Sequence, residues 1–274
     1  MIDSPLRKLL SFAAGRRLRR SLREFVQNSS LYDLPVAQCE PGKARVAVLA
    51  PHMDDEVLGC GGTIARHVMA GSEVTVIFLT DGRRGGGNLL SKDGTPTDPG
   101  KIVTVRKAEA QRAAQVLGIR DIAFLDAEDS RLHFDTRVAD RLRGILDPMR
   151  PEIVYLPFFL ERHPDHRAAS SVLLAATRGS GLHFECRGYE VWTPLFPNRL
   201  VRIDETLHLK QQALGCYESQ LAVMDYMHSG IGLNAYRAMS FGSPAIRFAE
   251  AFHALALDDY RRLYRSVARA QFRF

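Results

Sequence analysis

Three side chains that can bind metals or move protons lie within four residues of the chain, namely His52, Asp54 and Asp55. They follow an apolar run over residues 45–50 and precede a helical pattern, so the sequence predicts a turn from a strand into a helix. The turn at the carboxyl end of a buried strand is where open α/β sheets hold their sites. His52 and Asp55 can bind one cation there, which leaves the carboxylate of Asp54 free. This stretch is therefore a candidate metal-binding turn.

A second cluster of the same kind follows another apolar run, over residues 153–156. It consists of His163, Asp165 and His166. Two such turns at two strand ends predict one shared metal site. A catalytic zinc keeps three protein ligands and one open position, and His52, Asp55 and His166 supply such a set. The set suits Zn²⁺ and could also hold Fe²⁺, Co²⁺ or Mn²⁺.

Each cluster also has a structural interpretation. An aspartate at a helix start commonly accepts backbone N–H groups, so Asp54 and Asp55 alone could be a helix cap. The residues 163–166, His-Pro-Asp-His, could be a solvated turn. Two clusters that each follow an apolar strand rarely coincide by chance, and we therefore favour the metal site.

The remaining side chains of the two clusters suggest a hydrolytic reaction. A bound metal would lower the pKa of its water toward ~7. Asp54 stands beside a ligand and could take the water proton as a general base. His163, as an imidazolium, could stabilise an oxyanion or protonate a leaving amine, and Asp165 could orient it. These residues predict metal-assisted hydrolysis of an amide or an ester.

The elements that would position these side chains alternate along the chain. Apolar runs predict strands over residues 45–50, 73–79, 122–125 and 153–156. Helical patterns predict helices over residues 56–70, 102–117, 136–146 (ended by Pro148) and 167–177. This alternation predicts an α/β fold, a Rossmann-like and mostly parallel sheet with helices on both faces. Beyond Gly179 the pattern weakens to candidate strands over 190–193 and 200–203, and helical stretches within 207–220 and 243–263.

Length and composition fit one large domain of an ordinary globular protein. The chain has 274 residues, of which 46% are hydrophobic and 25% charged. The longest apolar runs are far below the roughly 20 residues that a membrane span needs. Four cysteines are scattered without a CxxC pair, and we recognise no signal peptide. We expect a reducing, cytoplasmic setting with free thiols.

The net charge of +6 is concentrated at the amino end. Residues 1–24 hold seven basic and two acidic side chains, which gives +5 and leaves +1 for the rest. A nucleic-acid enzyme would spread basic charge over its binding face, so we expect no nucleic-acid partner. Residues 1–27 predict a basic amphipathic helix, and the first region, 1–43, ends in a linker. The helix could lie on the inner face of an anionic membrane, pack on another subunit, or dock on its own domain.

A glycine-rich stretch follows the second predicted strand, within residues 80–100. It lacks the spacing of a phosphate-binding Walker loop, so we reject a nucleotide site. We expect it to form a rim over the pocket. Arg83 or Arg84 could meet an anionic group of the substrate there, or the loop could be merely solvated.

The two clusters resemble the motifs of the LmbE-like or PIG-L-like N-acetylglucosaminyl deacetylases, which carry Ala-His-Pro-Asp-Asp-Glu and His-Pro-Asp-His. Here they read Pro-His-Met-Asp-Asp-Glu over 51–56 and His-Pro-Asp-His over 163–166. Residues 61–64, 79–82 and 106–109 also resemble family features. The resemblance covers about residues 44–180 of a domain over 44–274, in which 181–274 would shape the substrate pocket.

The resemblance implies roles for individual residues. It implies zinc on His52, Asp55 and His166, Asp54 as the base, and His163 supported by Asp165 as the acid or electrophile. It also implies that Arg106 and Asp129 hold the sugar, although a helix-surface arginine and a turn aspartate are equally open interpretations. Met53 stands where the family usually has proline. Because proline stiffens a turn, this departure could relax Asp54.

The resemblance implies a metal-dependent hydrolase that removes the acetyl group from an N-acetylglucosamine-type amino sugar or glycoconjugate, free or lipid-linked, by attack of a metal-bound water. Two alternatives stay open. One is an amidase for a non-sugar N-acyl compound, and the other is a catalytically weak glycan-binding protein. The sequence does not indicate the oligomeric state.

Overall fold

The structure, a computed structural model, describes residues 36–85, 98–135 and 137–271. Residues Ala37–Phe274 form one compact unit. The predicted basic helix over residues 1–27 lies outside the described residues and stays a prediction. Within the described residues, no helix is both long and apolar enough to cross a membrane.

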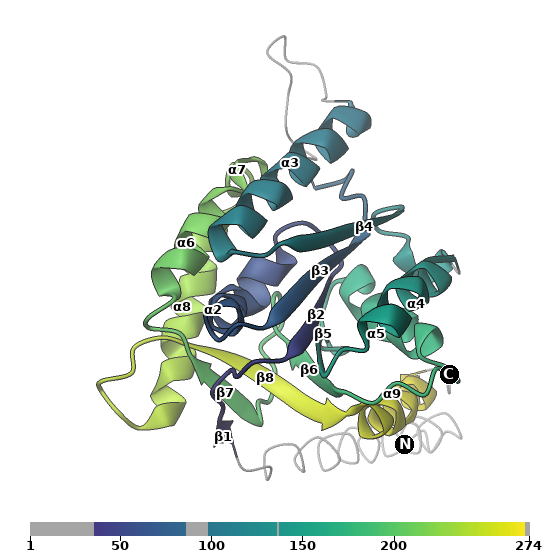
Figure 1. Ribbon diagram of the computed structural model, residues 1–274. Coiled ribbons are helices and arrows are strands. Elements are labelled where there is room, and N and C mark those ends of the chain that lie inside the picture. The colour runs from purple at the N-terminus through teal and green to yellow at the C-terminus, as the bar shows by residue number, and fades with distance from the viewer. Residues whose placement is uncertain (1–35, 86–97, 136, 272–274) are drawn as a thin grey trace, which may run out of the picture. The chain divides into compact units, whose positions relative to one another are not determined.

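The core of this unit is an eight-stranded sheet with the order β1-β7-β8-β6-β5-β2-β3-β4 (Figure 1). The strands are β1 Ala37–Gln38, β2 Arg45–Ala50, β3 Glu73–Thr80, β4 Asp121–Ala127, β5 Ile153–Pro157, β6 Glu185–Tyr189, β7 Arg199–Arg202 and β8 Ala249–Ala256. Strand β8 runs antiparallel to β6 and β7, whereas the other neighbours pair in parallel. The expected mostly parallel sheet is thus confirmed.

Helices cover both faces of the sheet (Figure 1). They are α2 Asp55–Met69, α3 Pro99–Leu117, α4 Arg137–Met149, α5 Pro164–Ala176, α6 Leu207–Gly215, α7 Glu218–Leu221, α8 Tyr226–Ala238 and α9 Leu257–Gln271, with short 3₁₀ turns at Leu132–Phe134 and Met239–Phe241. One apolar core lies between the sheet and α4, α5 and α9. The other lies between the sheet and α2, α3 and α6. The central parallel strands β2, β3 and β5 are therefore buried on both sides, as their apolar sequences require.

Helix α2 carries the first cluster at its start and is divided at Cys60, whose φ of −149° is not helical. The amides of Gly62 and Thr63, which begin the second segment, donate to the carboxylate of Glu250 at 3.0 and 2.7 Å. Glu250 is also paired with Lys210, whose Nζ lies 2.6 Å from Oε1. These buried charges stabilise the break and so fix the direction of the segment that carries the cluster.

A glycine allows α2 to approach the sheet closely. A Cβ atom at Gly59 would lie 2.1 Å from Cδ2 of Tyr189, a distance that no side chain tolerates. Tyr189 is itself fixed, because its hydroxyl donates to the carbonyl of Leu49 at 2.9 Å. The first turn of α2 therefore lies directly against β6.

The predicted strands and helices up to residue 177 occur with their ends shifted by a few residues. Pro148, expected to end its helix, lies in the last turn of α4, where Arg150 N still bonds to Leu146 O at 2.9 Å. Helix α5 begins within the second cluster, at Pro164, because proline suits the first position of a helix.

The carboxyl-terminal predictions were less accurate. The strand expected over 190–193 is wrong, because β6 ends at Tyr189 and Glu190 turns inward to bond with Arg237 at 2.6–2.8 Å. The helical stretch expected within 243–263 occurs as the start of α9 at Leu257, but strand β8, Ala249–Ala256, precedes it and was not predicted. The segment 200–203 does form a strand, β7.

Candidate active site

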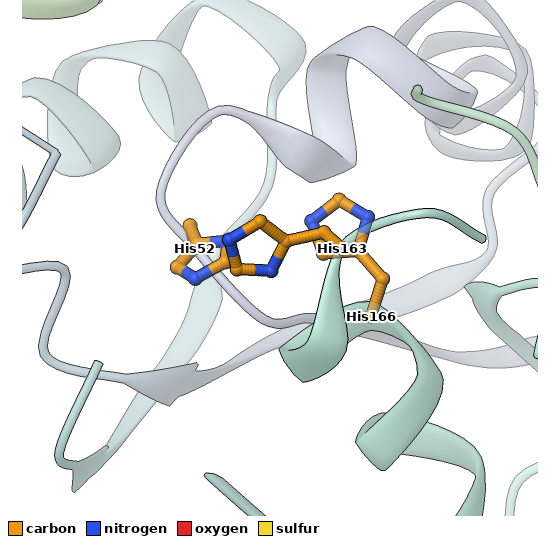
Figure 2. A group of neighbouring side chains, drawn as sticks. All are labelled: His52, His163 and His166. Atoms are coloured by element: carbon orange, nitrogen blue, oxygen red, sulfur yellow. The ribbon is translucent and has the colours of Figure 1, made fainter. Parts of the chain in front are cut away.

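The two clusters meet at the carboxyl ends of β2 and β5, which are neighbours in the sheet. The ring centroid of His52 lies 4.8 Å from that of His163 and 5.4 Å from that of His166. Figure 2 shows the three imidazoles gathered at one point, although His52 comes from a distant part of the sequence. The structure therefore brings the sequence-predicted residues into one site.

The turn after β2 is held firmly despite the absence of a proline at position 53. The backbone N–H and the hydroxyl of Thr80 both donate to the carbonyl of Pro51, at 3.0 and 2.7 Å. The side chain of Met53 is fully buried, and its carbonyl accepts a 2.6 Å hydrogen bond from Arg106. These contacts hold the turn that carries Asp54, and the effect of Met53 on Asp54 stays a prediction.

The predicted ligand atoms have the spacing of a metal site. Oδ2 of Asp55 lies 3.2 Å from Nδ1 of His52 and 3.2 Å from Nε2 of His166. Adjacent ligands of a tetrahedral ion bound at about 2.1 Å are about 3.4 Å apart. Among the described residues, neither ring nitrogen of the fully buried His166 has a partner in hydrogen-bond geometry, although Nε2 lies 3.2 Å from the Asp55 carboxylate. Such an orphaned ring fits a metal ligand.

Other donors also approach His52. Its ring groups with those of His163 and His166, and also with the carboxylates of Asp129 and Asp165, in sets whose ligand atoms lie within 4.8 Å of one another. Nε2 of His52 is 3.3 Å from both Asp129 and Asp165. The site therefore offers two overlapping sets of side chains that could hold a metal ion, one of three histidines and one of a histidine and two carboxylates. His52 belongs to both sets.

Burial and neighbouring charges shift the pKa values of the two adjacent aspartates in opposite directions. Burial raises the pKa of Asp54 to about 7, although the guanidinium of Arg106 opposes the rise. For Asp55, burial also acts upward, but His166 and His52 hold its pKa well below the usual range. Burial and the charges of His52 and His166 lower the pKa of His163. The two adjacent aspartates thus differ in protonation, since the pKa of Asp54 is about 7 and that of Asp55 lies well below its usual range.

Asp165 has partners other than the expected ones. Its carboxylate lies against His52 and accepts the amides of Ser130 at 2.6 Å and Leu132 at 3.2 Å. His163 meets only the backbone of this residue, because its Nδ1 accepts the amide N–H of Asp165 at 3.2 Å. The structure thus differs from the expectation that the Asp165 carboxylate orients His163.

Arg106 and Asp129, the two residues with open interpretations, both lie in the site. Arg106 is only 2% exposed, so it is not a surface arginine, and it lies 3.4 Å from Oδ1 of Asp54. Its guanidinium also donates to the carbonyl of Gly82 at 3.2 Å. Asp129 accepts the amide of Arg84 at 2.9 Å. Arg106 links the site to the start of the glycine-rich stretch, of which residues 86–97 lie outside the described residues.

The pocket over the site is lined by one arginine that the sequence indicated and by two aromatic residues that the sequence interpretation missed. Arg84 lines it, whereas Arg83 pairs with Asp81 at 2.6 Å. Trp192 and Tyr226 also line it. Trp192 is the sole tryptophan of the chain, a signal that could have drawn attention to it. Tyr226 begins α8, a helix that was not predicted.

Comparisons with known proteins agree with this site. A family model described as GlcNAc-PI de-N-acetylase, PIG-L, matches residues 47–177. The chain is 30% identical over 192 residues to diacetylchitobiose deacetylase of Thermococcus kodakarensis, covering 64% of this chain and 70% of that protein. The chain belongs to the PIG-L family. The resemblance inferred from the two motifs is thereby confirmed.

Solved structures extend the likeness to PIG-L proteins over most of the fold. N,N′-diacetylchitobiose deacetylase of Pyrococcus horikoshii superposes with a TM-score of 0.65 at 23% identity, covering 77% of this chain and 84% of that one. A 4-carboxy-2-hydroxymuconate hydratase of Pseudomonas putida gives 0.64 at 23% identity, covering 77% and 95%. At this identity the likeness shows the fold alone. Since the second protein is a hydratase, the residues of the site must decide the reaction.

Proposed function

We propose that this protein is a metal-dependent hydrolase that removes the acetyl group from an N-acetylated amino sugar. One observation carries the proposal. The orphaned ring of His166 faces Asp55 beside Asp54, a buried carboxyl whose pKa of about 7 suits a general base. The amino-sugar part of the proposal is supported by the family and by the related diacetylchitobiose deacetylase.

His52, Asp55 and His166 would hold the metal, and we propose zinc because two imidazoles and one carboxylate form a common catalytic zinc set. When bound, the ion would supply a Lewis acid and a water of lowered pKa. Asp129 and Asp165 fix the ring of His52, since both approach its Nε2 at 3.3 Å. Such outer carboxylates orient ligating histidines.

Asp54 moves the proton in this mechanism. It takes a proton from the attacking water and returns it to the nitrogen that leaves, so that water and amide give acetate and amine. Arg106 stabilises the ionised form of Asp54 before attack. Asp54 also has an unusual backbone φ of 136°, which directs its side chain from the turn before α2.

His163 serves the carbonyl oxygen of the acetyl group. Its Nδ1 accepts a backbone N–H, so the proton of the neutral ring lies on Nε2. Its pKa is lowered, which favours this neutral form over the imidazolium expected from the sequence. Nε2–H can then donate to the oxygen as negative charge develops.

A lipid-linked amino sugar is the finer version of this proposal. The cluster of basic residues in 1–24 would attract anionic lipids by about 1 kcal/mol for each base at the surface. Deletion of residues 1–27 should then reduce sedimentation with anionic liposomes and leave hydrolysis of soluble substrates intact. Unchanged sedimentation would exclude this use of the segment.

The test of the proposed function is acetate release from N-acetylglucosamine, N,N′-diacetylchitobiose and a non-sugar amide such as N-acetylethanolamine. We expect release from the sugars, loss on chelation, and recovery with zinc. Asp54→Asn should lower the rate by about 10²–10⁴-fold, whereas the exposed control Asp258→Asn should not. Release from the non-sugar amide alone would favour the amidase alternative, and release unaffected by Asp54→Asn would contradict the mechanism.

A further inference from the structure

We propose that the indole of Trp192 is a platform on which the sugar ring of the substrate stacks, with the ring of Tyr226 set nearly perpendicular against it. This inference rests on the proposed function and assigns a subsite to it. Trp192 is 43% exposed, and it is the one large exposed apolar side chain of the described residues that lines the pocket. An exposed indole inside a pocket that is otherwise rich in charge indicates a binding surface.

The pocket is lined by two chemically different kinds of side chain. Its lining includes polar side chains, among them Asp54, Arg106 and His163, and apolar or aromatic ones, namely Leu58, Val191, Trp192 and Tyr226. A pyranose has the same division, because hydroxyl and amide groups surround its edge while C–H groups cover its faces. An amino sugar that directs its acetamide to the polar side chains can therefore lay a C–H face on the indole.

Trp192 is held in place by a buried carboxylate. Oε1 of Glu161 accepts the successive amides of Val191, Trp192 and Thr193, at 2.6, 3.0 and 3.2 Å. Glu161 is 2% exposed, and its Oε2 lies 3.8 Å from Nδ1 of the candidate ligand His166. The backbone that carries the indole is thus held by a carboxylate that lies next to the metal group, and a preorganised subsite needs such support.

Tyr226 comes from another element and packs against the indole as a side support. Its ring meets that of Trp192 edge to face, with centroids 5.8 Å apart. It begins α8, where Asp225 caps the helix by accepting the amide of His228 at 2.9 Å. Burial and the charges of Asp54 and Asp55 raise the pKa of Tyr226 to about 12, so its hydroxyl stays neutral near the carboxylates. Tyr226 thus lines the same pocket as Asp54 and Asp55.

The sole tryptophan makes the subsite directly observable, since all tryptophan fluorescence comes from Trp192. The Asp54→Asn variant is titrated with N-acetylglucosamine, and with N-methylacetamide, which has the amide but no ring. We expect a saturable change in emission with the sugar and none with the amide. Equal changes with both compounds, or no change with the sugar, would overturn the platform.

Kinetics of N-acetylglucosamine hydrolysis provide the second readout. Trp192→Ala and Tyr226→Ala should each raise KM by about three- to tenfold with little change in kcat, and Trp192→Phe should restore most of the loss. Tyr236→Ala, at a tyrosine that is 61% exposed and does not line the pocket, is the matched control. An unchanged KM in both alanine variants would overturn the platform and leave the deacetylase intact. A saturable emission change without acetate release from any sugar would support the platform and overturn the deacetylase.

Discussion

Helix α2 carries a buried charged cluster at each of two places, and the two differ in how completely they are paired. At its start, both nitrogens of His166 and Nε of Arg106 have no hydrogen-bond partner among the described residues. At its break, Nζ of Lys210 donates to Leu58 O at 2.8 Å and to Glu250, whose two oxygens are both bonded. Both clusters are buried, so the difference does not come from solvent.

The comparison separates structural charge from functional charge. Burial of an unpaired polar group costs free energy, so a structural cluster is selected to be complete. Unpaired buried nitrogens of ionisable side chains beside a pocket are candidates to bind a ligand. We therefore assign the Lys210–Glu250 pair to folding and the cluster at the start of α2 to chemistry. Substitutions in the pair should mainly lower stability, and substitutions in the cluster should mainly lower activity.

The largest expected effect on stability is at the paired cluster. Lys210→Met strands the buried carboxylate of Glu250 and should lower the free energy of unfolding by about 3–5 kcal/mol, measured by urea denaturation. Lys210→Met combined with Glu250→Gln removes both charges and should recover part of that loss. A cost below about 1 kcal/mol for the single variant would break the comparison, because the pair would then not stabilise the fold.

The next effect is catalytic. Arg106→Gln removes the charge that lowers the pKa of Asp54, so this pKa should rise above about 7. The acid limb of the pH–rate profile for acetate release should then move to higher pH, with a rate loss of about 100-fold from poorer positioning of the base. Arg106→Lys keeps the charge and should keep the limb in place while it loses rate. An unmoved limb in Arg106→Gln would exclude Asp54 as the titrating base.

A smaller effect on stability is expected at a second hydrogen-bonded network, which joins α2 to strands β5 and β6. Nε2 of His67 bonds to the hydroxyl of Tyr155 at 3.0 Å, and that hydroxyl accepts from Arg187 at 2.8 Å. Burial and the charge of Arg187 lower the pKa of His67 to about 4. In the unfolded chain this histidine takes up its proton near pH 6.5. The neutral His67 therefore stabilises the folded state fully above that pH, and this contribution is lost as the pH falls toward 4.

His67→Gln tests this sign. Between pH 7.5 and pH 5 the natural protein should lose about 2 kcal/mol more unfolding free energy than the variant. Urea denaturation at the two pH values measures the difference, with His208→Gln, at an exposed histidine of α6, as the control. Equal losses in the natural protein and His67→Gln would mean that the histidine is not held neutral.

The sequence predicted the catalytic half of the fold because its chemistry begins where apolar strands end. The runs before His52 and His163 are uninterrupted, so both turns could be placed within a few residues. Strand β8 was missed because Glu250 and His253 are buried polar residues in its interior, which breaks the apolar pattern. The partner of Asp165 could not be predicted either, because it depends on which backbone amides surround the carboxylate.

The subsite residues were hidden for a related reason. The position of Trp192 depends on three amides that converge on Glu161, and no local pattern encodes such a contact. Tyr226 depends on where α8 meets the pocket, and the two glycines of that helix obscure its pattern. Long-range contacts of this kind place the residues proposed for specificity, whereas the residues proposed for chemistry lie in local motifs.

We infer that a metal ion binds the cluster at the start of α2 and pairs the ring nitrogen that is left without a partner. The most direct test measures the free energy of unfolding of the metal-free protein with and without zinc, beside His166→Ala. We expect zinc at about 100 times its dissociation constant to stabilise the natural protein by about 2.7 kcal/mol and to leave His166→Ala unchanged. Equal stabilisation of both proteins, or of neither, would contradict the claim.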